Sequence, residues 1–287
     1  MKPGFAIGAL VLAVVAVQSH IDESFGEYRS TEEILYIDNP RFLKKLLVGF
    51  ENVAADLYWL RTVQYFGGKR REAANKNFDL LDPLLQITVT LDPKFKIAYT
   101  YGATFLSEPF PQGAGAPSKG VALIDDGIRQ HPGHWRFFLD KGFIYYWYLR
   151  DYKKAAEVFL EGSRIEGAPY WMRTTAGRAF AQGGDRQTAR GLWQIIHDTA
   201  ETPQQVDNAA IHLRQLDALD QLDALRQVAA LFEKRTGRYP KSWAELVSGG
   251  FLRTAPVDPT GALYVLDPAK RDVGLSPESK LGRLPAH

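Results

Sequence analysis

The histidines are the first residues of this chain whose chemistry could support a metal site or a catalyst. His131 and His134 are separated by a Pro-Gly pair, a spacing that metal ligands can have. No further histidine and no carboxylate pair lies near them, so the pattern favours a turn between repeats over a metal centre. His197 and His212 are single histidines in helical patterns, and we expect packed or surface side chains there.

Three aspartates form the second pattern, because Asp217, Asp220 and Asp223 recur in the segment QLDALDQLDALR. A cation site would need their carboxylates to converge on one point. Steps of three residues instead wind around a helix that has 3.6 residues per turn. The spacing therefore favours a solvated helix face over a cation site.

Other catalytic signatures are missing from the sequence. It has no G-x-S-x-G, no P-loop and no dinucleotide fingerprint, and the stretch Gly113-Ala114-Gly115 lacks the preceding strand and following lysine of a phosphate loop. The chain has no cysteine, which excludes a disulfide framework, a thiolate nucleophile and cysteine-ligated metals. We predict a protein that is not an enzyme and has no catalytic residue, metal or cofactor.

Aromatic side chains are the most informative group, with nine of them between residues 135 and 152. One helical stripe cannot bury them all, so some must face solvent or a partner. We expect Phe138, Tyr145, Tyr146 and Phe159 to fill a core. The remainder points to binding.

The elements that carry these residues are predicted to be helices. From Pro40 onward apolar residues recur every three or four positions, and strand-like alternation is nearly absent before residue 260. A 34-residue period relates two sets of residues, namely Asp151, Ala155 and Phe159, and then Asp185, Ala189 and Trp193. A small residue lets two helices approach closely, and the aromatic residue fills the space beside it. These patterns predict an all-α fold.

This unit resembles the tetratricopeptide repeat (TPR), and the resemblance is best over residues 134–203. It departs in two places. Gly142 lies one residue from its expected position, and a Pro/Gly-rich loop at 107–120 separates the two helices of one unit. We expect that loop to be a surface excursion, either a plain linker or a contact arm.

The resemblance implies a helical solenoid whose first helix in each unit lines a concave binding surface. Carried over to this sequence, it nominates partner-binding residues, which are Phe137, Ile144, Trp147, Tyr148, Trp171, Arg178 and Gln182. The best-known peptide clamps of the family hold a terminal carboxylate with several Lys and Asn residues. Only Lys141 and Arg178 are nearby candidates here, so that ligand is not assumed.

The C-terminal part has two predicted pieces. Residues 204–236 form one long helix, whose apolar face serves either as the end cap or as the interface of a homo-oligomer. Residues 237–287 form a small α/β-hairpin module with a capping box, a Gly-Gly stop, a turn at 258–261 and a strand at 264–266. This module resembles the C-terminal region of type II secretion pseudopilins, through Gly-Arg-Tyr-Pro and Asp-Pro-x-Gly-x-x-Tyr. Ala9 stands where a prepilin has glutamate, so we infer a shared module rather than a pilin subunit.

The N-terminal run at residues 4–17 has no polar side chain. As a helix it would span about 21 Å, short of the roughly 30 Å hydrocarbon core, so residues 1–21 are a signal peptide or a hydrophobic membrane-anchor helix. Lys2 precedes the run and acidic residues follow it, which places the body outside the cytoplasm, in a bacterial-type periplasm or outside the cell. The net charge of +2, with 35 basic and 33 acidic residues spread along the chain, argues against nucleic-acid binding.

These observations predict a linker and first helix at 22–47 and TPR-like repeats at 48–203, between the N-terminal segment and the long helix. The expected function is a membrane-tethered extracytoplasmic scaffold that binds proteins in an envelope complex. The alternative is a structural accessory of a pilus, filament or type II secretion apparatus. An enzyme built on the 107–120 loop and a histidine is the weakest hypothesis.

Overall fold

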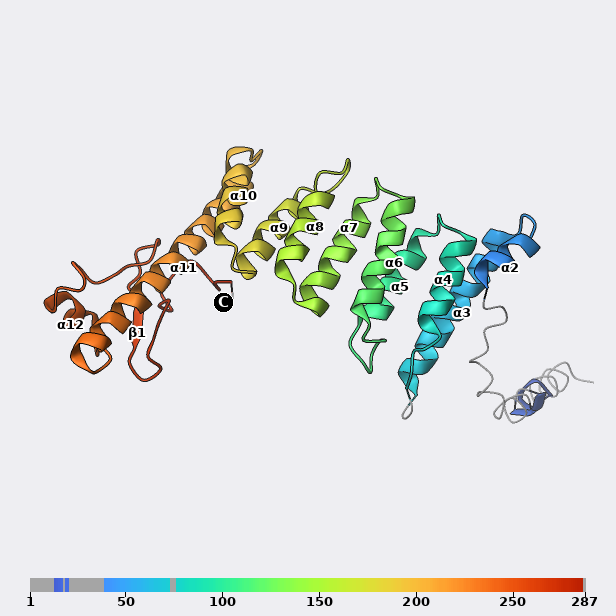
Figure 1. The fold of residues 1–287 in the computed structure, drawn as a ribbon, viewed down its shortest axis with the longest axis horizontal. Helices are drawn as coiled ribbons and strands as arrows, with labels where there is room; N and C mark the ends of the chain where they lie inside the picture. The colour runs from blue at the N-terminus through green and yellow to red at the C-terminus, as the bar shows by residue number, and fades with distance from the viewer. Residues whose placement is uncertain (1–12, 18, 21–38, 73–75, 286–287) are drawn as a thin grey trace, which may run out of the picture. The chain divides into compact units, whose positions relative to one another are not determined.

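The computed structural model describes residues 13–17, 19–20, 39–72 and 76–285. Most of the predicted N-terminal segment at 1–21 lies outside these residues. Within the described residues, no helix combines the length and the apolar character needed to cross a membrane. The chain divides into two compact units, Met1–Pro132 and Gly133–His287. Helices dominate the described parts of both units (Figure 1), which confirms the all-α class.

Unit 1 consists of helices, and from α3 onward each helix packs on the next one in the chain. α3 packs on α4, α4 on α5 and α5 on α6, while the short α2 packs on α4. Asn39 caps α2 by accepting a hydrogen bond from the Phe42 N–H. The helices are α2 Pro40–Leu46, α3 Glu51–Arg71, α4 Leu81–Leu91, α5 Lys96–Ser107 and α6 Pro117–Gln130.

The loop between α5 and α6 folds back onto the end of α5. The N–H groups of Ala114 and Ala116 donate to the carbonyls of Phe105 and Leu106, which lie in the last turn of α5 and have no partner within the helix. The loop is thus a surface excursion that completes a helix end.

Unit 2 continues the pattern of neighbouring helices and ends in a small hairpin. α7 packs on α8, α8 on α9, α9 on α10 and α10 on α11. Asp151 and Asp185 cap α8 and α10 at equivalent positions, 34 residues apart. The elements are α7 Trp135–Phe143, the π-helix η2 Ile144–Leu149, α8 Tyr152–Gly162, α9 Trp171–Gln182, α10 Arg186–Asp198, α11 Pro203–Thr236, α12 Trp243–Ser248, β1 Val265–Asp267 and β2 Asp272–Gly274.

Aromatic rings lie directly on glycines where these helices cross. A Cβ added to Gly142 would lie 2.3 Å from the Phe159 ring, and one added to Gly177 would lie 2.9 Å from the Trp193 ring. The rings are 34 residues apart, but the glycines are 35 apart. The π-helix η2 accounts for the difference, because a π-type turn takes up one more residue than an α-helical turn. The displaced position of Gly142 in the sequence is the mark of this insertion.

The C-terminal module packs on the second half of α11. Leu222 and Leu225 of α11 share a core with Tyr264 and Val273, and β1 and β2 pair antiparallel with Leu266 opposite Val273. Ser242 caps α12 as its capping box predicts, and the helix ends at Gly249. The predicted helix and the turn at 258–261 are confirmed, and the strand lies at Val265–Asp267, one residue beyond the predicted 264–266.

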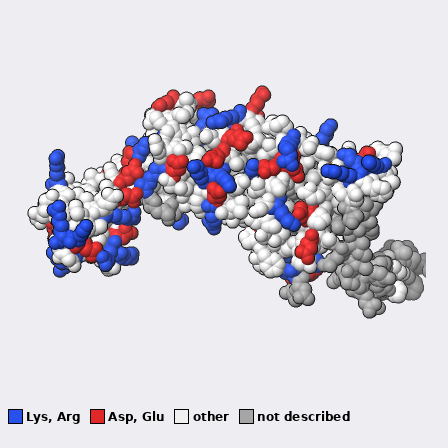
Figure 2. Space-filling view, viewed as in Figure 1, with Lys and Arg blue, Asp and Glu red and all other residues white. Residues whose placement is uncertain are grey.

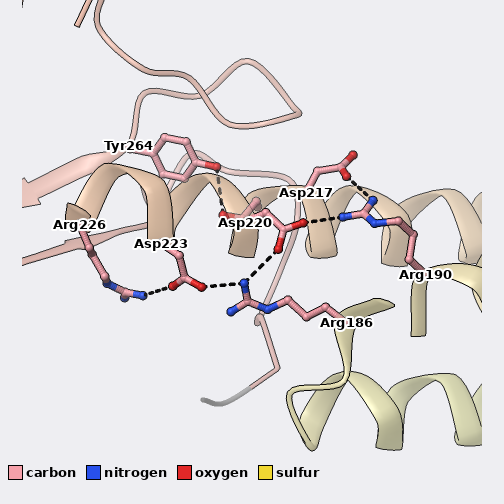
Figure 3. Close-up of polar contacts among 8 residues, drawn as sticks. Arg186, Arg190, Asp217, Asp220, Asp223, Arg226 and Tyr264 are labelled. Atoms are coloured by element: carbon pink, nitrogen blue, oxygen red, sulfur yellow. Dashed lines mark hydrogen bonds and ion pairs between the residues drawn. The ribbon is translucent and has the colours of Figure 1, made fainter. Parts of the chain in front are cut away.

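A ladder of ion pairs joins α10 to α11 (Figure 3), and one further pair joins α11 to β2. Arg190 binds Asp217 and Asp220, while Arg186 binds Asp220 at 3.0 Å and Asp223 at 2.7 Å. Arg226 then joins Asp223 to Asp272. The three aspartates lie on the solvated helix face that their spacing predicts. Their side chains are 42 to 52% exposed. Each also pairs with an arginine of α10, because Arg186 and Arg190 lie four residues apart on one face of that helix.

The contact between Gly142 and Phe159 yields a stability prediction. Gly142→Ala should lower the free energy of unfolding, because overpacking costs about 1–3 kcal/mol and exceeds the gain in helix propensity of about 1 kcal/mol. The matched control is Gly191→Ala in α10, where an added Cβ meets nothing within 4 Å, and which should stabilise by about 1 kcal/mol. Urea unfolding of both variants measures the difference, and equal effects would contradict the close approach.

Candidate binding cleft

Unit 2 contains a cleft of about 460 Å³ that opens to solvent. Its walls come from η2, α9, α10, α11 and the segment at 283–285. The volume lies in the range of ligand-binding clefts. Its lining residues are Tyr146, Trp147, Arg150, Tyr152, Arg178, Ala181, Gln182, Trp193, His212, Gln215, Leu216, Arg283, Leu284 and Pro285.

The π-helix supplies the aromatic wall of the cleft. Tyr146 contacts Trp147 and Tyr152 edge to face, with ring centroids 4.9 and 5.0 Å apart. Trp147 remains 55% exposed. The π-helix ends at Arg150, whose φ of 56° is left-handed, and the Arg150 guanidinium donates to the Tyr152 hydroxyl at 3.3 Å. Trp147 of η2 and Arg150, the residue that follows this π-helix, thus lie on the same side of the cleft.

A chain of hydrogen bonds forms the floor of the cleft. Arg178 Nε donates to His212 Nε2 at 3.3 Å, and His212 Nδ1 lies 2.7 Å from Gln215 Oε1. Gln215 is buried, and its amide Nε2 donates to the Leu281 carbonyl at 2.7 Å. These partners assign the hydrogen of the neutral imidazole to Nδ1. The chain links α9 through α11 to the C-terminal segment.

Trp193 packs against one face of the His212 ring. The two rings are stacked with centroids 4.1 Å apart and an angle of 25° between planes, and Trp193 is 1% exposed. Burial lowers the pKa of His212, and the Arg178 charge acts in the same direction, against the opposing effect of the Gln215 hydrogen bond. His212 is therefore held in its neutral form.

The C-terminal segment is fixed by the turn at Asp258. The Asp258 carboxylate accepts hydrogen bonds from the N–H groups of Thr260 and Ala262 and from the Ser279 hydroxyl. Burial alone would raise the pKa of Asp258, but these hydrogen bonds hold it below its usual value. The Lys280 N–H also donates to Thr260 Oγ1. The predicted turn therefore positions the segment that supplies Arg283 to the cleft.

The cleft is positively charged. Arg150, Arg178 and Arg283 line it, and its lining includes no Asp or Glu. Burial and the neighbouring Tyr152 raise the pKa of Tyr146, although Arg150 and Arg178 both act against the rise. The combination of three guanidinium groups with exposed aromatic surface suits an anionic ligand that also carries apolar groups.

Three predicted partner-binding residues line the cleft, namely Trp147, Arg178 and Gln182. Lys141 and Tyr148 are half-buried and lie outside its lining, as does Trp171, which is 41% exposed at the start of α9.

Two predicted residues require correction, because Phe137 is 0% exposed and Ile144 is 3% exposed. A uniform 34-residue period pairs Phe137 with Trp171 and Ile144 with Arg178. Because η2 contains one extra residue, positions that precede it are separated by 35 residues from their equivalents in the next helix pair, as Gly142 is from Gly177. Phe137 and Ile144 are therefore equivalent to Met172 and Ala179. Those two residues are also 0% exposed, so all four are core positions. The expected core residues Phe138 and Phe159 are confirmed, whereas Tyr146 faces the cleft.

Sequence reasoning missed Arg150, Tyr152, His212 and Arg283. Two features of the sequence pointed to the part of the cleft that η2 forms, namely the aromatic cluster at 135–152 and the displacement of Gly142 by one residue. Nothing in the sequence indicated that residues near the C-terminus would return to α9. His212 was expected to be packed or on the surface, and it is packed but also hydrogen bonded at both ring nitrogens.

Metal ligation finds no support in the part of the chain that the structure describes, where no three His, Asp or Glu side chains cluster. His131 Nε2 lies 3.1 Å from the Pro93 carbonyl oxygen. The His134 ring packs edge to face on Phe137. Each of these histidines thus has a structural contact within its own unit.

Comparisons with known proteins found no family model, no curated protein and no solved structure that matches this chain.

The environment of His212 yields a pH prediction. Its pKa is lower in the fold than the ordinary value of 6.5, so the unfolded chain binds more protons as the pH falls through that value. The free energy of unfolding of unit 2 should decrease between about pH 8 and about pH 5.5. Urea unfolding followed by tryptophan fluorescence measures it.

His212→Gln should flatten this part of the pH dependence, since glutamine does not titrate. His197→Gln, at the half-buried histidine of α10, removes a different histidine of the same unit and is measured beside it as the matched control. An equal pH dependence in wild type and His212→Gln would show that His212 is not the group responsible.

Proposed function

We propose that this protein is a membrane-tethered, extracytoplasmic TPR-like scaffold that binds other proteins of a multi-subunit envelope complex. Its partner site is the cleft between η2, α9, α11 and residues 283–285. The bound element is an acidic peptide segment that carries at least one aromatic or aliphatic side chain.

The composition of the cleft is the observation that carries this proposal. Aromatic residues and arginine dominate the energetics of protein interfaces, and here Trp147 is exposed beside Arg150 and Arg178. The described lining residues include no Asp or Glu, so a partner's Asp or Glu would meet three guanidinium groups there. Bidentate pairing of guanidinium with carboxylate gives such a segment both affinity and orientation.

The same geometry argues against a catalytic role for the cleft. Among the residues that the structure describes, His212 is the imidazole that lines the cleft, and both of its nitrogens are engaged by Arg178 and Gln215. A general base needs a free ring nitrogen within reach of the substrate. Binding is therefore the function that these contacts favour.

The TPR-like solenoid is supported by the match between period and packing. Two successive helix pairs place an aromatic ring on a small residue, Phe159 on Gly142 and Trp193 on Gly177. Ala155 and Ala189, the small residues named by the period, are both 0% exposed. A repeat that packs only on its neighbours builds an extended surface suited to protein binding.

The membrane tether and the extracytoplasmic location rest on the apolar run at 4–17 and on the charges that flank it. Both signs of charge are interspersed on the face of each unit that Figure 2 shows, as expected for a partner other than nucleic acid. The alternative function, an accessory of a pilus, filament or secretion apparatus, is a more specific form of the same scaffold. It rests on the pseudopilin-like turn.

Affinity purification from cross-linked membranes of the native host tests the proposal. Quantitative mass spectrometry would compare the envelope proteins recovered with wild type, with Trp147→Ala and with Arg283→Glu. Loss of a buried interface tryptophan costs at least about 1.4 kcal/mol, or tenfold in affinity. We expect both variants to lose the same partners.

Two matched variants serve as controls. Tyr170→Ala removes an exposed aromatic side chain of the same unit, and Arg253→Glu reverses an exposed charge; neither residue lines the cleft. Both should retain the partners. If the four variants recover the same proteins as wild type while remaining folded, the cleft is not the partner site.

A further inference from the structure

An exposed apolar elbow joins α2 to α3 in unit 1. Phe42, Leu46, Val48 and Phe50 are 55, 58, 81 and 67% exposed. Four large apolar side chains within nine residues are far more than scattered surface exposure requires. We refer to residues 40–50 as the elbow.

The opposite side of the elbow is anchored in the core. Leu43 is buried with Ala55, Ile87 and Leu91, and the Lys44 ammonium donates to the Thr90 carbonyl at 2.9 Å. Leu47, four residues further on, packs against the same cluster, whereas Phe42 and Leu46 are exposed on the outer side. The apolar tip is therefore presented by the fold.

The backbone at the tip keeps Val48 exposed. Val48 has a φ of 36°, in the left-handed region that β-branched residues rarely adopt. Gly49 follows with a φ of 93°, and its N–H donates to the Glu51 carboxylate at 3.2 Å. The turn therefore places Val48, the most exposed of the four apolar side chains, at the apex of the elbow.

The charge of the elbow points to the chemistry of its partner. Arg41, Lys44 and Lys45 lie in it, and it contains no Asp or Glu. Most of the charged atoms over α2 in Figure 2 are basic. Further along α3, by contrast, the exposed Val53 and Leu57 flank an exposed Asp56. Within residues 40–50 the charged side chains are therefore all basic, and the Glu51 carboxylate that follows them accepts the Gly49 N–H.

We propose that the elbow inserts its apolar tip into the interfacial region of an anionic lipid bilayer. Aromatic and aliphatic side chains bury in the headgroup and acyl boundary while lysine and arginine meet anionic lipid headgroups. Each cation near such a surface contributes about fivefold in affinity.

Chain length places the elbow within reach of the membrane. The apolar run ends at residue 17 and the elbow starts at residue 40, so the intervening chain spans at most about 80 Å. The inference rests on the membrane tether of the proposed function for this proximity. It is independent of the cleft, which belongs to unit 2.

The absence of cysteine allows a single label to report on the elbow. Val48→Cys in the full chain would carry an environment-sensitive fluorophore, and Ile195→Cys on α10, 54% exposed, provides the matched control. The labelled proteins are mixed with vesicles of phosphatidylglycerol and phosphatidylcholine, or of phosphatidylcholine alone. Co-sedimentation reports binding, and quenching by lipid-borne or aqueous quenchers reports depth.

We expect the label at 48 to be quenched by shallow lipid-borne quenchers and protected from aqueous iodide, in anionic vesicles and not in neutral ones. The label at 195 should remain open to iodide throughout. Arg41→Glu with Lys45→Glu should expose the label at 48 to iodide, while circular dichroism confirms that the helices persist.

Three results would overturn the inference. The chain does not sediment with anionic vesicles, or it sediments while the label at 48 stays as open to iodide as the label at 195. Alternatively, labels at 48 lie close to one another without lipid, which would assign the elbow to a contact between copies. None of these outcomes bears on partner recovery through the cleft, so the two proposals fail separately.

Discussion

The packing of Trp193 is the interaction on which the rest of unit 2 depends. Its indole can lie in the helix crossing only because Gly177 has no side chain, and it also stacks on the ring of His212. His212 in turn orients Arg178 and Gln215, and Gln215 holds the C-terminal segment through the Leu281 carbonyl. One buried ring thus connects the crossing of α9 and α10 to the hydrogen-bonded floor of the cleft.

Helix periodicity could be predicted from the sequence because it follows from local packing. Ala155, Ala189, Phe159 and Trp193 lie where the 34-residue period requires, and the caps and turn of the C-terminal module depend on a few adjacent residues. Phe137 and Ile144 were misplaced because one extra residue in η2 shifts the helical face that precedes it. An insertion of this kind leaves only a small trace in one sequence, here the displaced Gly142.

The remainder of the cleft depends on contacts between distant segments. Arg283 and Leu281 reach α11 through the fold of the whole module, over a sequence separation of 66 residues between Gln215 and Leu281. The aspartates of α11 gave no sign of their arginine partners, because those lie on the preceding helix. Long-range polar pairing of this type has no periodic signature, so helical pattern alone could not reveal the charge of the site.

Site-specific photo-cross-linking tests the central claim about the cleft most directly. A photoreactive phenylalanine analogue would replace Trp147 in the native host, and the linked peptide would be sequenced by mass spectrometry. The account predicts a link to an Asp- or Glu-rich segment of an envelope protein, which disappears when Arg283→Glu is added. A link to a segment without acidic residues, or one that persists with Arg283→Glu, would contradict it.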